Sequence, residues 1–276
     1  DRLQLEHGSS FRAILVNSGN ANACTGERGL NDAWSMVRQT AAALNVSENE
    51  VFVSSTGVIG QYMPMEKVSA GITEAASLLD ADGNTAAAEA IMTTDKFTKE
   101  LAVRVNLGGT DVTIGGVAKG SGMIAPNMAT MLAFITTDAA IAPELLQSAL
   151  KTAADRSFNR ITVDGDTSTN DMVLVLANGL AGNPVITSTA HPLYADFYEA
   201  FELLLVKLCK MIVVDGEGAT KFVEILVMNA ATEENAVCAA RSIANSNLVK
   251  TAINGEDANW GRILNAVGYS GIDFLP

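Results

Sequence analysis

The chain has 276 residues, 48% of them hydrophobic and 18% charged, which is enough apolar material for a packed core. Its formal net charge of −13 repels phosphate backbones and anionic lipid, which argues against nucleic acid and membranes as partners and favours a small cationic or zwitterionic substrate. The most apolar stretch, 201–214, contains three charged residues and falls short of the ~20 apolar residues that a membrane-spanning helix needs.

Strands and helices are predicted to alternate along the chain, from β-rich runs bounded by turns and from apolar residues at helical spacing. In chain order we expect a strand at 11–17, a helix at 30–44, a strand at 51–54, a helix at 65–79, strands at 101–107, 111–117 and 131–136, a helix from Pro143, a strand at 172–177, a long helix from His191, a strand at 222–228 and a helix at 233–244. Gly108-Gly109 indicates a hairpin. The pattern predicts an α/β or α+β fold with a boundary near Lys221.

Histidine and cysteine are scarce, and this narrows the chemistry. Two histidines leave little for a Ser-His-Asp triad or a His-rich metal site. The three cysteines form no CxxC pair, which suggests reduced thiols in a cytosol-like compartment. Cys24 has no histidine nearby in sequence and is expected to be a buried small residue.

Two further patterns have competing interpretations. Segment 115–122 places glycines around Lys119, but the lysine precedes its glycine and the spacing does not fit a phosphate loop, so a bulged strand end is expected instead. Asp164, Asp166 and Asp171 could form a Ca²⁺ or Mg²⁺ cluster. They lack the EF-hand glutamate, and we expect a hydrogen-bonded turn and no metal.

Thr130, by spacing alone, is a threonine that enters a strand. The segments around it resemble the ornithine acetyltransferase family, also called bifunctional glutamate N-acetyltransferase, along nearly the whole chain. The similar segments are VNSGNANACTG (16–26), SSTGVIG (54–60), IMTTD (91–95), AKGSGMIAPNMATML (118–132), VDGDTSTND (163–171), DGEGATK (215–221), NSNLVKTAINGEDANWGR (245–262) and GYSG (268–271). Together, in the family's order, they are highly specific.

The resemblance implies a precursor that cleaves itself between Ala129 and Thr130. The new α-amine of Thr130 would have a pKa of about 7.7–8.0 and could take the proton of its own hydroxyl. One residue would then supply nucleophile and base, which suits a chain poor in histidine. The implied reaction moves the acetyl group of N-acetyl-L-ornithine to L-glutamate through an acetyl-Thr130 ester, by a ping-pong mechanism in arginine biosynthesis.

The resemblance also implies the other site residues. Thr56 and Gly57 would hold the tetrahedral oxyanion. Thr93, Lys119, Thr130 and Glu217 would bind substrate. From charge, we assign Lys119 to the substrate carboxylate and Glu217 to the side-chain ammonium of ornithine. Sequence alone does not distinguish Thr93 from the adjacent Thr94 as the residue that contacts substrate.

The implied fold is a four-layer α-β-β-α sandwich over residues 1–221, with a smaller α/β unit at 222–276 that is shortened relative to the family. Members continue past GYSG to an asparagine and a threonine of the pocket, so part of the pocket is expected to lie outside this sequence. The implied assembly is a heterotetramer of two cleaved α and two β fragments. We expect no cofactor, with acetyl-CoA as an optional co-substrate, in the cytoplasm or a fungal mitochondrial matrix.

Two alternatives compete with this hypothesis. An N-terminal-nucleophile aminopeptidase or amidase of related fold would pass the acyl group to water, and the positions of Lys119 and Glu217 argue against it. A binding protein without catalysis would leave the Ala129–Thr130 bond uncut.

Overall fold

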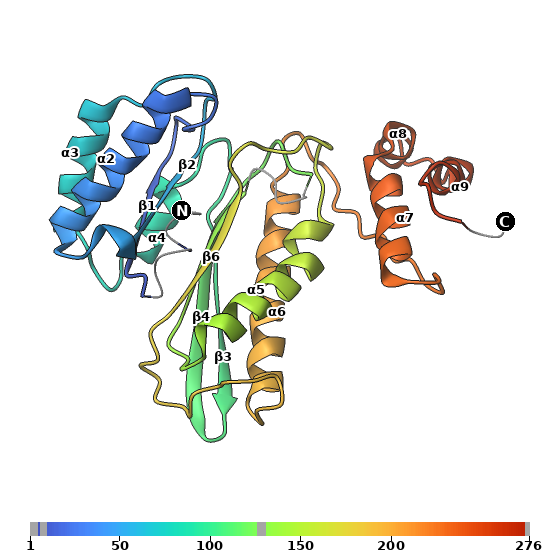
Figure 1. Ribbon diagram of the computed structural model, residues 1–276. Coiled ribbons are helices and arrows are strands. Elements are labelled where there is room, and N and C mark those ends of the chain that lie inside the picture. Colours follow the sequence, from blue (N-terminus) through green and yellow to red (C-terminus); the bar gives the residue numbers. More distant parts are fainter. Residues whose placement is uncertain (1–4, 6–9, 126–130, 274–276) are drawn as a thin grey trace.

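The computed structural model describes residues 5, 10–125 and 131–273, and helices and strands interleave along them (Figure 1). This confirms the α/β class. The elements are β1 (Ala13–Asn17), α2 (Gly26–Leu44), β2 (Val51–Ser55), α3 (Met65–Ser77), α4 (Asn84–Ala90), β3 (Lys99–Leu107), β4 (Thr110–Lys119), β5 (Leu132–Thr137), α5 (Pro143–Arg156), β6 (Met172–Ala177), α6 (Tyr194–Val214), α7 (Glu233–Asn245), α8 (Asn247–Asn254) and α9 (Trp260–Gly268). Helices α4, α8 and α9 had no counterpart among the predicted elements.

The strands form two sheets. β1 and β2 pair in parallel, with Asn17 opposite Ser55. The second sheet has the order β3-β4-β5-β6, in which the predicted hairpin β3–β4 and the β4–β5 pair are antiparallel and β5–β6 is parallel. At one end of this sheet Lys119 lies opposite Leu132, and Leu132 lies opposite Met172.

The two sheets face each other. Strand β1 contacts a different layer on each side, because successive side chains of a strand point to opposite faces. Ile14 and Val16 pack with Leu132 and Phe134 of β5. On the other face, Leu15 packs against the cluster made by α2 and α3. Helices α5 and α6 cover the far side of the larger sheet (Figure 1). The layers therefore follow the expected α-β-β-α order.

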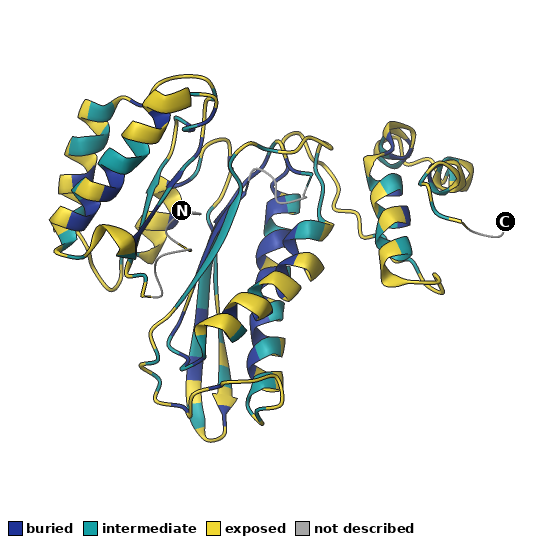
Figure 2. Cartoon of the chain, in the orientation of Figure 1, coloured by how far each residue is buried: buried dark blue, intermediate teal, exposed yellow. Residues whose placement is uncertain are grey.

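Helix α6 is central to the main hydrophobic core. It begins at Tyr194, after a turn in which the His191 ring accepts the backbone N–H of Leu193. Phe197, Phe201 and neighbouring apolar residues are fully buried against β3 and β4 (Figure 2). No helix in the described part of the chain is long and apolar enough to cross a membrane.

The prediction of a strand at 222–228 is wrong. This segment is extended, but none of the described strands pairs with it, and a strand requires such a ladder. Ile225 packs on a small cluster made by α7, α8 and α9, whereas Leu226 and Met228 are 80% and 71% exposed. The described residues after Lys221 are thus helices and loops, not the expected α/β unit. The domain boundary itself stays a prediction.

Candidate active site

The end of strand β4 brings three of the predicted site residues together. Lys119 is only 3% exposed, and its Nζ donates to Thr93 Oγ1 at 2.8 Å and to Thr56 Oγ1 at 3.1 Å. Thr56 follows β2, so this contact joins the ends of the two sheets. An ammonium that donates to both hydroxyl oxygens leaves the hydroxyl protons free to point elsewhere.

Position 57 has no room for a side chain. Its φ is +130°, and an added Cβ would lie 2.3 Å from the carbonyl carbon of Gly19 and 2.6 Å from the backbone nitrogen of Asn20. The N–H of Thr56 donates to Asn17 O at 3.0 Å and is therefore already used. An oxyanion hole built here would use the Thr56 hydroxyl and the Gly57 N–H.

A buried network of ion pairs lies next to Lys119. Lys99 Nζ bonds to Asp95 and to Asp215 at 2.6 Å each, and all three side chains are fully buried. Asp95 also accepts the N–H of Gly120 at 2.7 Å and lies 3.9 Å from Lys119 Nζ. The network joins β3, the loop after α4 and the end of α6 at the site.

The ionisation of these groups follows from burial and from their partners. Burial raises the pKa of Asp95, but the hydrogen bonds from Lys99, Gly120 and Thr93 outweigh it, so that the net pKa is lowered. Burial lowers the pKa of Lys119, opposed by Asp95 and Glu217 and assisted by Lys99. The site thus holds a partly desolvated ammonium beside an ionised carboxylate.

Glu217 lies at the exposed side of the site. Its Oε1 accepts the hydroxyl of Thr94 at 2.6 Å, and its N–H donates to Ser121 O at 2.7 Å. Gly122 makes room for it, since an added Cβ would lie 2.6–2.8 Å from the Glu217 carboxylate. The adjacent threonines therefore have separate partners: Thr93 contacts Lys119, and Thr94 contacts Glu217.

Ala129 and Thr130, the expected cleavage site, lie outside the described residues. The chain is anchored on both sides of them. Asp164 accepts the N–H of Met123 at 2.5 Å and of Ile124 at 2.9 Å. Asp171 accepts the N–H of Met131 at 2.7 Å.

Asp171 and Asn170 were not predicted to act at the site. Asn170 Nδ2 donates to the backbone oxygen of Ser55, next to Thr56. Burial raises the pKa of Asp171 to about 7, against the lowering effect of the Met131 N–H. Asp95, Lys99 and Asp215 were missed as well, although 91–95 and 215–221 were among the segments that carried the resemblance.

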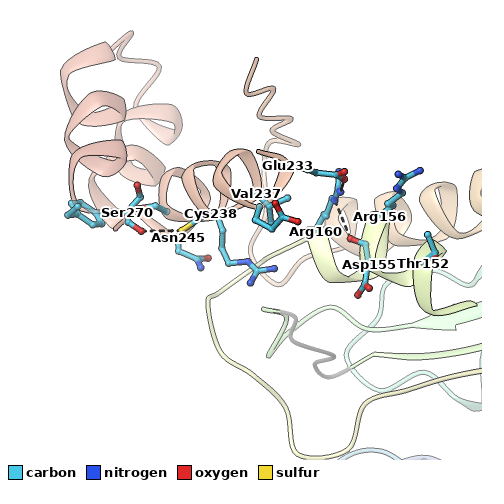
Figure 3. Close-up of a pocket in the computed structure, with 13 residues that line it drawn as sticks. Thr152, Asp155, Arg156, Arg160, Glu233, Val237, Cys238, Asn245 and Ser270 are labelled. Carbon is cyan, nitrogen blue, oxygen red and sulfur yellow. Dashed lines mark hydrogen bonds and ion pairs between the residues drawn. The ribbon is translucent and has the colours of Figure 1, made fainter. Parts of the chain in front are cut away.

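A separate pocket of the described chain lies away from these residues. It has a volume of about 840 Å³ between α5 and α7, where Arg160 pairs with Glu233 (Figure 3). Cys238, which is exposed, donates to Ser270 O across its far end. Contrary to expectation, Cys24 is also exposed. None of the predicted site residues lines this pocket.

The fold and the site define a class: an α/β sandwich protein whose polar centre is built from lysine, threonine and carboxylates at facing sheet ends. Comparison with known proteins agrees. The ArgJ family model matches residues 1–276, and the chain belongs to this family.

Similar proteins can be named individually. The chain is 59% identical over 267 residues, 96% of its length, to the arginine biosynthesis bifunctional protein ArgJ of Symbiobacterium thermophilum. It is 55% identical over 263 residues, 95% of its length, to that of Caldanaerobacter subterraneus. The crystal structure of the Bacillus halodurans protein shares 54% identity and a TM-score of 0.50, over 51% of this chain and 66% of that one. The chain spans 66% and 65% of the length of the first two relatives.

Proposed function

We propose that the protein is an autoproteolytic acetyltransferase of arginine biosynthesis that moves the acetyl group of N-acetyl-L-ornithine to L-glutamate. Membership of the ArgJ family supports the reaction class. The observation that carries the proposal is the buried Lys119 ammonium, which donates to Thr56 and Thr93 where the two sheets meet.

In the first step of the proposed reaction, Thr130 Oγ attacks the acetyl carbonyl carbon of N-acetylornithine. The α-amine of Thr130 takes the hydroxyl proton, and the Thr56 hydroxyl and Gly57 N–H stabilise the oxyanion. The C–N bond then breaks, ornithine leaves with that proton on its amine, and the acetyl group remains as an ester on Thr130.

In the second step the uncharged α-amine of glutamate attacks the ester carbonyl. The C–O bond breaks, and the proton lost by the glutamate nitrogen returns to Thr130 Oγ. N-acetylglutamate leaves, and the enzyme is ready for another cycle. No external base is required, which fits a centre without histidine among the described residues.

Substrate orientation follows from the charges of the site. The buried Lys119 cation suits the α-carboxylate that ornithine and glutamate share. Glu217 lies at the exposed side and suits the side-chain ammonium of ornithine, so the acetyl group would lie between the two. This polarity favours an amino-acid acceptor over the water that an amidase of related fold would use.

Three further parts of the proposal concern the whole protein. Acetyl-CoA is a possible second donor, which would make the enzyme bifunctional. The cleaved fragments stay together, and two copies form a heterotetramer of two α and two β fragments. We place it in the cytoplasm, supported by three cysteines that are all free.

The test combines mass and turnover on the natural full-length protein. Two fragments, the second beginning Thr-Met-Leu, and ornithine release that depends on glutamate are expected. Thr130→Ala should stay whole and inactive, whereas Thr136→Ala, an exposed threonine of β5, should behave as wild type. Ornithine release at full rate without glutamate would indicate an amidase and contradict the proposal.

A further inference from the structure

Asp171 holds the backbone immediately after the proposed nucleophile. It precedes β6, whose first residue, Met172, pairs with Leu132 of β5. Its Oδ1 accepts the N–H of Met131 at 2.7 Å, while the N–H of Met172 donates back to Met131 O at 3.1 Å. Met131 is the first described residue after the proposed nucleophile. The carboxylate of Asp171 therefore holds the backbone nitrogen of Met131.

The second oxygen of this carboxyl group is buried without a matching donor. Asp171 Oδ2 has no hydrogen-bond partner among the described residues, and the same is true of Ser54 Oγ. Both residues line a cavity of about 280 Å³ between β2, α2 and the start of β6. A buried carboxylate with a free oxygen is costly, so a structural hydrogen bond alone does not account for an aspartate at this position.

We propose that Asp171 is the positioning residue of Thr130, which holds the following peptide so that the hydroxyl can attack, first the Ala129 carbonyl and then the substrate. The inference rests on the proposed function, because it needs Thr130 as the nucleophile. It adds a residue that the family resemblance did not assign.

The ionised form of Asp171 should position best, because a carboxylate accepts an N–H more strongly than a neutral acid does. Burial raises the pKa of Asp171 to about 7, so protonation falls inside an accessible range. Asp171 is the one ionisable residue among the described residues that line this cavity. Asp32 of α2 is adjacent in sequence to the cavity-lining Ala33. The shift itself comes from burial, opposed by the Met131 N–H.

Maturation is the cleaner readout, since Thr130 has no free α-amine before cleavage. The full-length protein is produced by cell-free translation in the cold and diluted into buffers from about pH 5.5 to 8.5. The appearance of the two fragments is followed by intact mass. The variants are Asp171→Asn, which keeps an oxygen for the Met131 N–H, and Asp171→Ala, which keeps none. Asp32→Asn and Ser54→Ala are matched controls from the same cavity.

The expected wild-type cleavage rate rises with pH through about 7. Asp171→Asn should be slower at pH 8 and should lose this rise. Asp171→Ala should be slower still, by about 10- to 100-fold relative to wild type, the usual effect of losing a hydrogen bond to a charged group. Both control variants should follow the wild-type profile.

Two results would overturn the inference, and they are distinguishable from failure of the proposed function. If wild type cleaves normally and Asp171→Asn shows the same rate and pH profile, Asp171 has no positioning role, while the acetyltransferase function stands. If Asp32→Asn abolishes the pH dependence while Asp171→Asn leaves it intact, the pH dependence does not come from Asp171. A wild type that never splits would refute the proposed function and this inference with it. Should Asp171→Ala fail to fold, the near-isosteric Asp171→Asn decides.

Discussion

Replacing Lys99 with methionine should destabilise the protein strongly and in a pH-dependent way. Methionine has a similar shape, but it removes the ammonium that bonds to Asp95 and Asp215 at 2.6 Å each. Removing one partner of a buried ion pair typically costs about 3–5 kcal/mol, because a charge is left without compensation.

The size of this loss in stability depends on the hydrogen bonds that the carboxylates of Asp95 and Asp215 keep in the variant. Asp95 still accepts the N–H groups of Gly120 and Thr93, and Asp215 still accepts that of Lys96. We therefore expect a loss of about 3–5 kcal/mol in the free energy of unfolding at pH 7.5, not twice that amount. With a urea dependence of about 3 kcal/mol/M, the midpoint should fall by about 1–2 M.

The sign of the pH dependence distinguishes this explanation from lost packing. In wild type the lowered pKa of Asp95 contributes stability above its unfolded pKa, and this contribution is lost as pH falls through the folded value. Without Lys99, fewer hydrogen bonds oppose the effect of burial on Asp95, so the pKa of Asp95 in the folded protein should rise. The destabilisation should then be largest at neutral pH and shrink as pH falls toward 4.

The assay is urea unfolding between pH 4 and 7.5, in the uncut Thr130→Ala background so that one chain unfolds. Lys96→Met is the matched control, because Lys96 is exposed and only its backbone N–H contacts Asp215; it should change stability by less than about 0.5 kcal/mol. A loss below about 1 kcal/mol for Lys99→Met, or a loss constant across this pH range, would refute the electrostatic reasoning.

Other expectations concern catalysis. Thr56→Ala should lower kcat by about 10²–10³ with little change in KM, whereas Thr56→Ser should retain most activity; a change in KM alone would place Thr56 in binding. Glu217→Gln should raise KM for N-acetylornithine more than for glutamate, and equal effects on both would contradict its pairing with the ornithine ammonium. Gly122→Ala should resemble it, because the added Cβ displaces the Glu217 carboxylate; unchanged steady-state kinetics would refute this steric argument. Thr130→Ser keeps a hydroxyl and should still mature and transfer, with an acetyl group trapped on its second fragment by rapid quenching without glutamate; no trapped acetyl group would argue against the ester.

Local pattern predicted most of the elements, since strand and helix periodicity depend on neighbouring residues. The strand at 172–177 and the helix from Pro143 have the predicted starts. The predicted strand at 222–228 is wrong because local pattern does not show whether a strand has a partner. No described strand pairs with this segment. Helix α4, rich in alanine and only seven residues long, lacks the apolar stripe that would have marked it.

The candidate site was predictable only where the resemblance assigned a role. Lys119, Thr56 and Thr93 are far apart in sequence, and periodicity says nothing of which strand ends meet. Residues that act through other residues were missed altogether. Lys99 and Asp215 are separated by more than a hundred positions, and only the folded chain shows them bonded.

One sequence signal could have indicated the buried network. Lys99 opens a strand whose residues alternate between the two sheet faces. Asp95 lies in a loop after Thr94, and Asp215 lies in a turn before Gly216. Ionisable residues at such positions are either solvated or paired inside the protein. In a chain with two histidines, pairing inside the protein is the more useful expectation for these residues. A site without imidazole must set its charges with lysines and carboxylates. The same argument applies to Asp171: a buried carboxylate that precedes β6 and accepts the N–H of Met131 is better explained by that contact than by the strand that follows it.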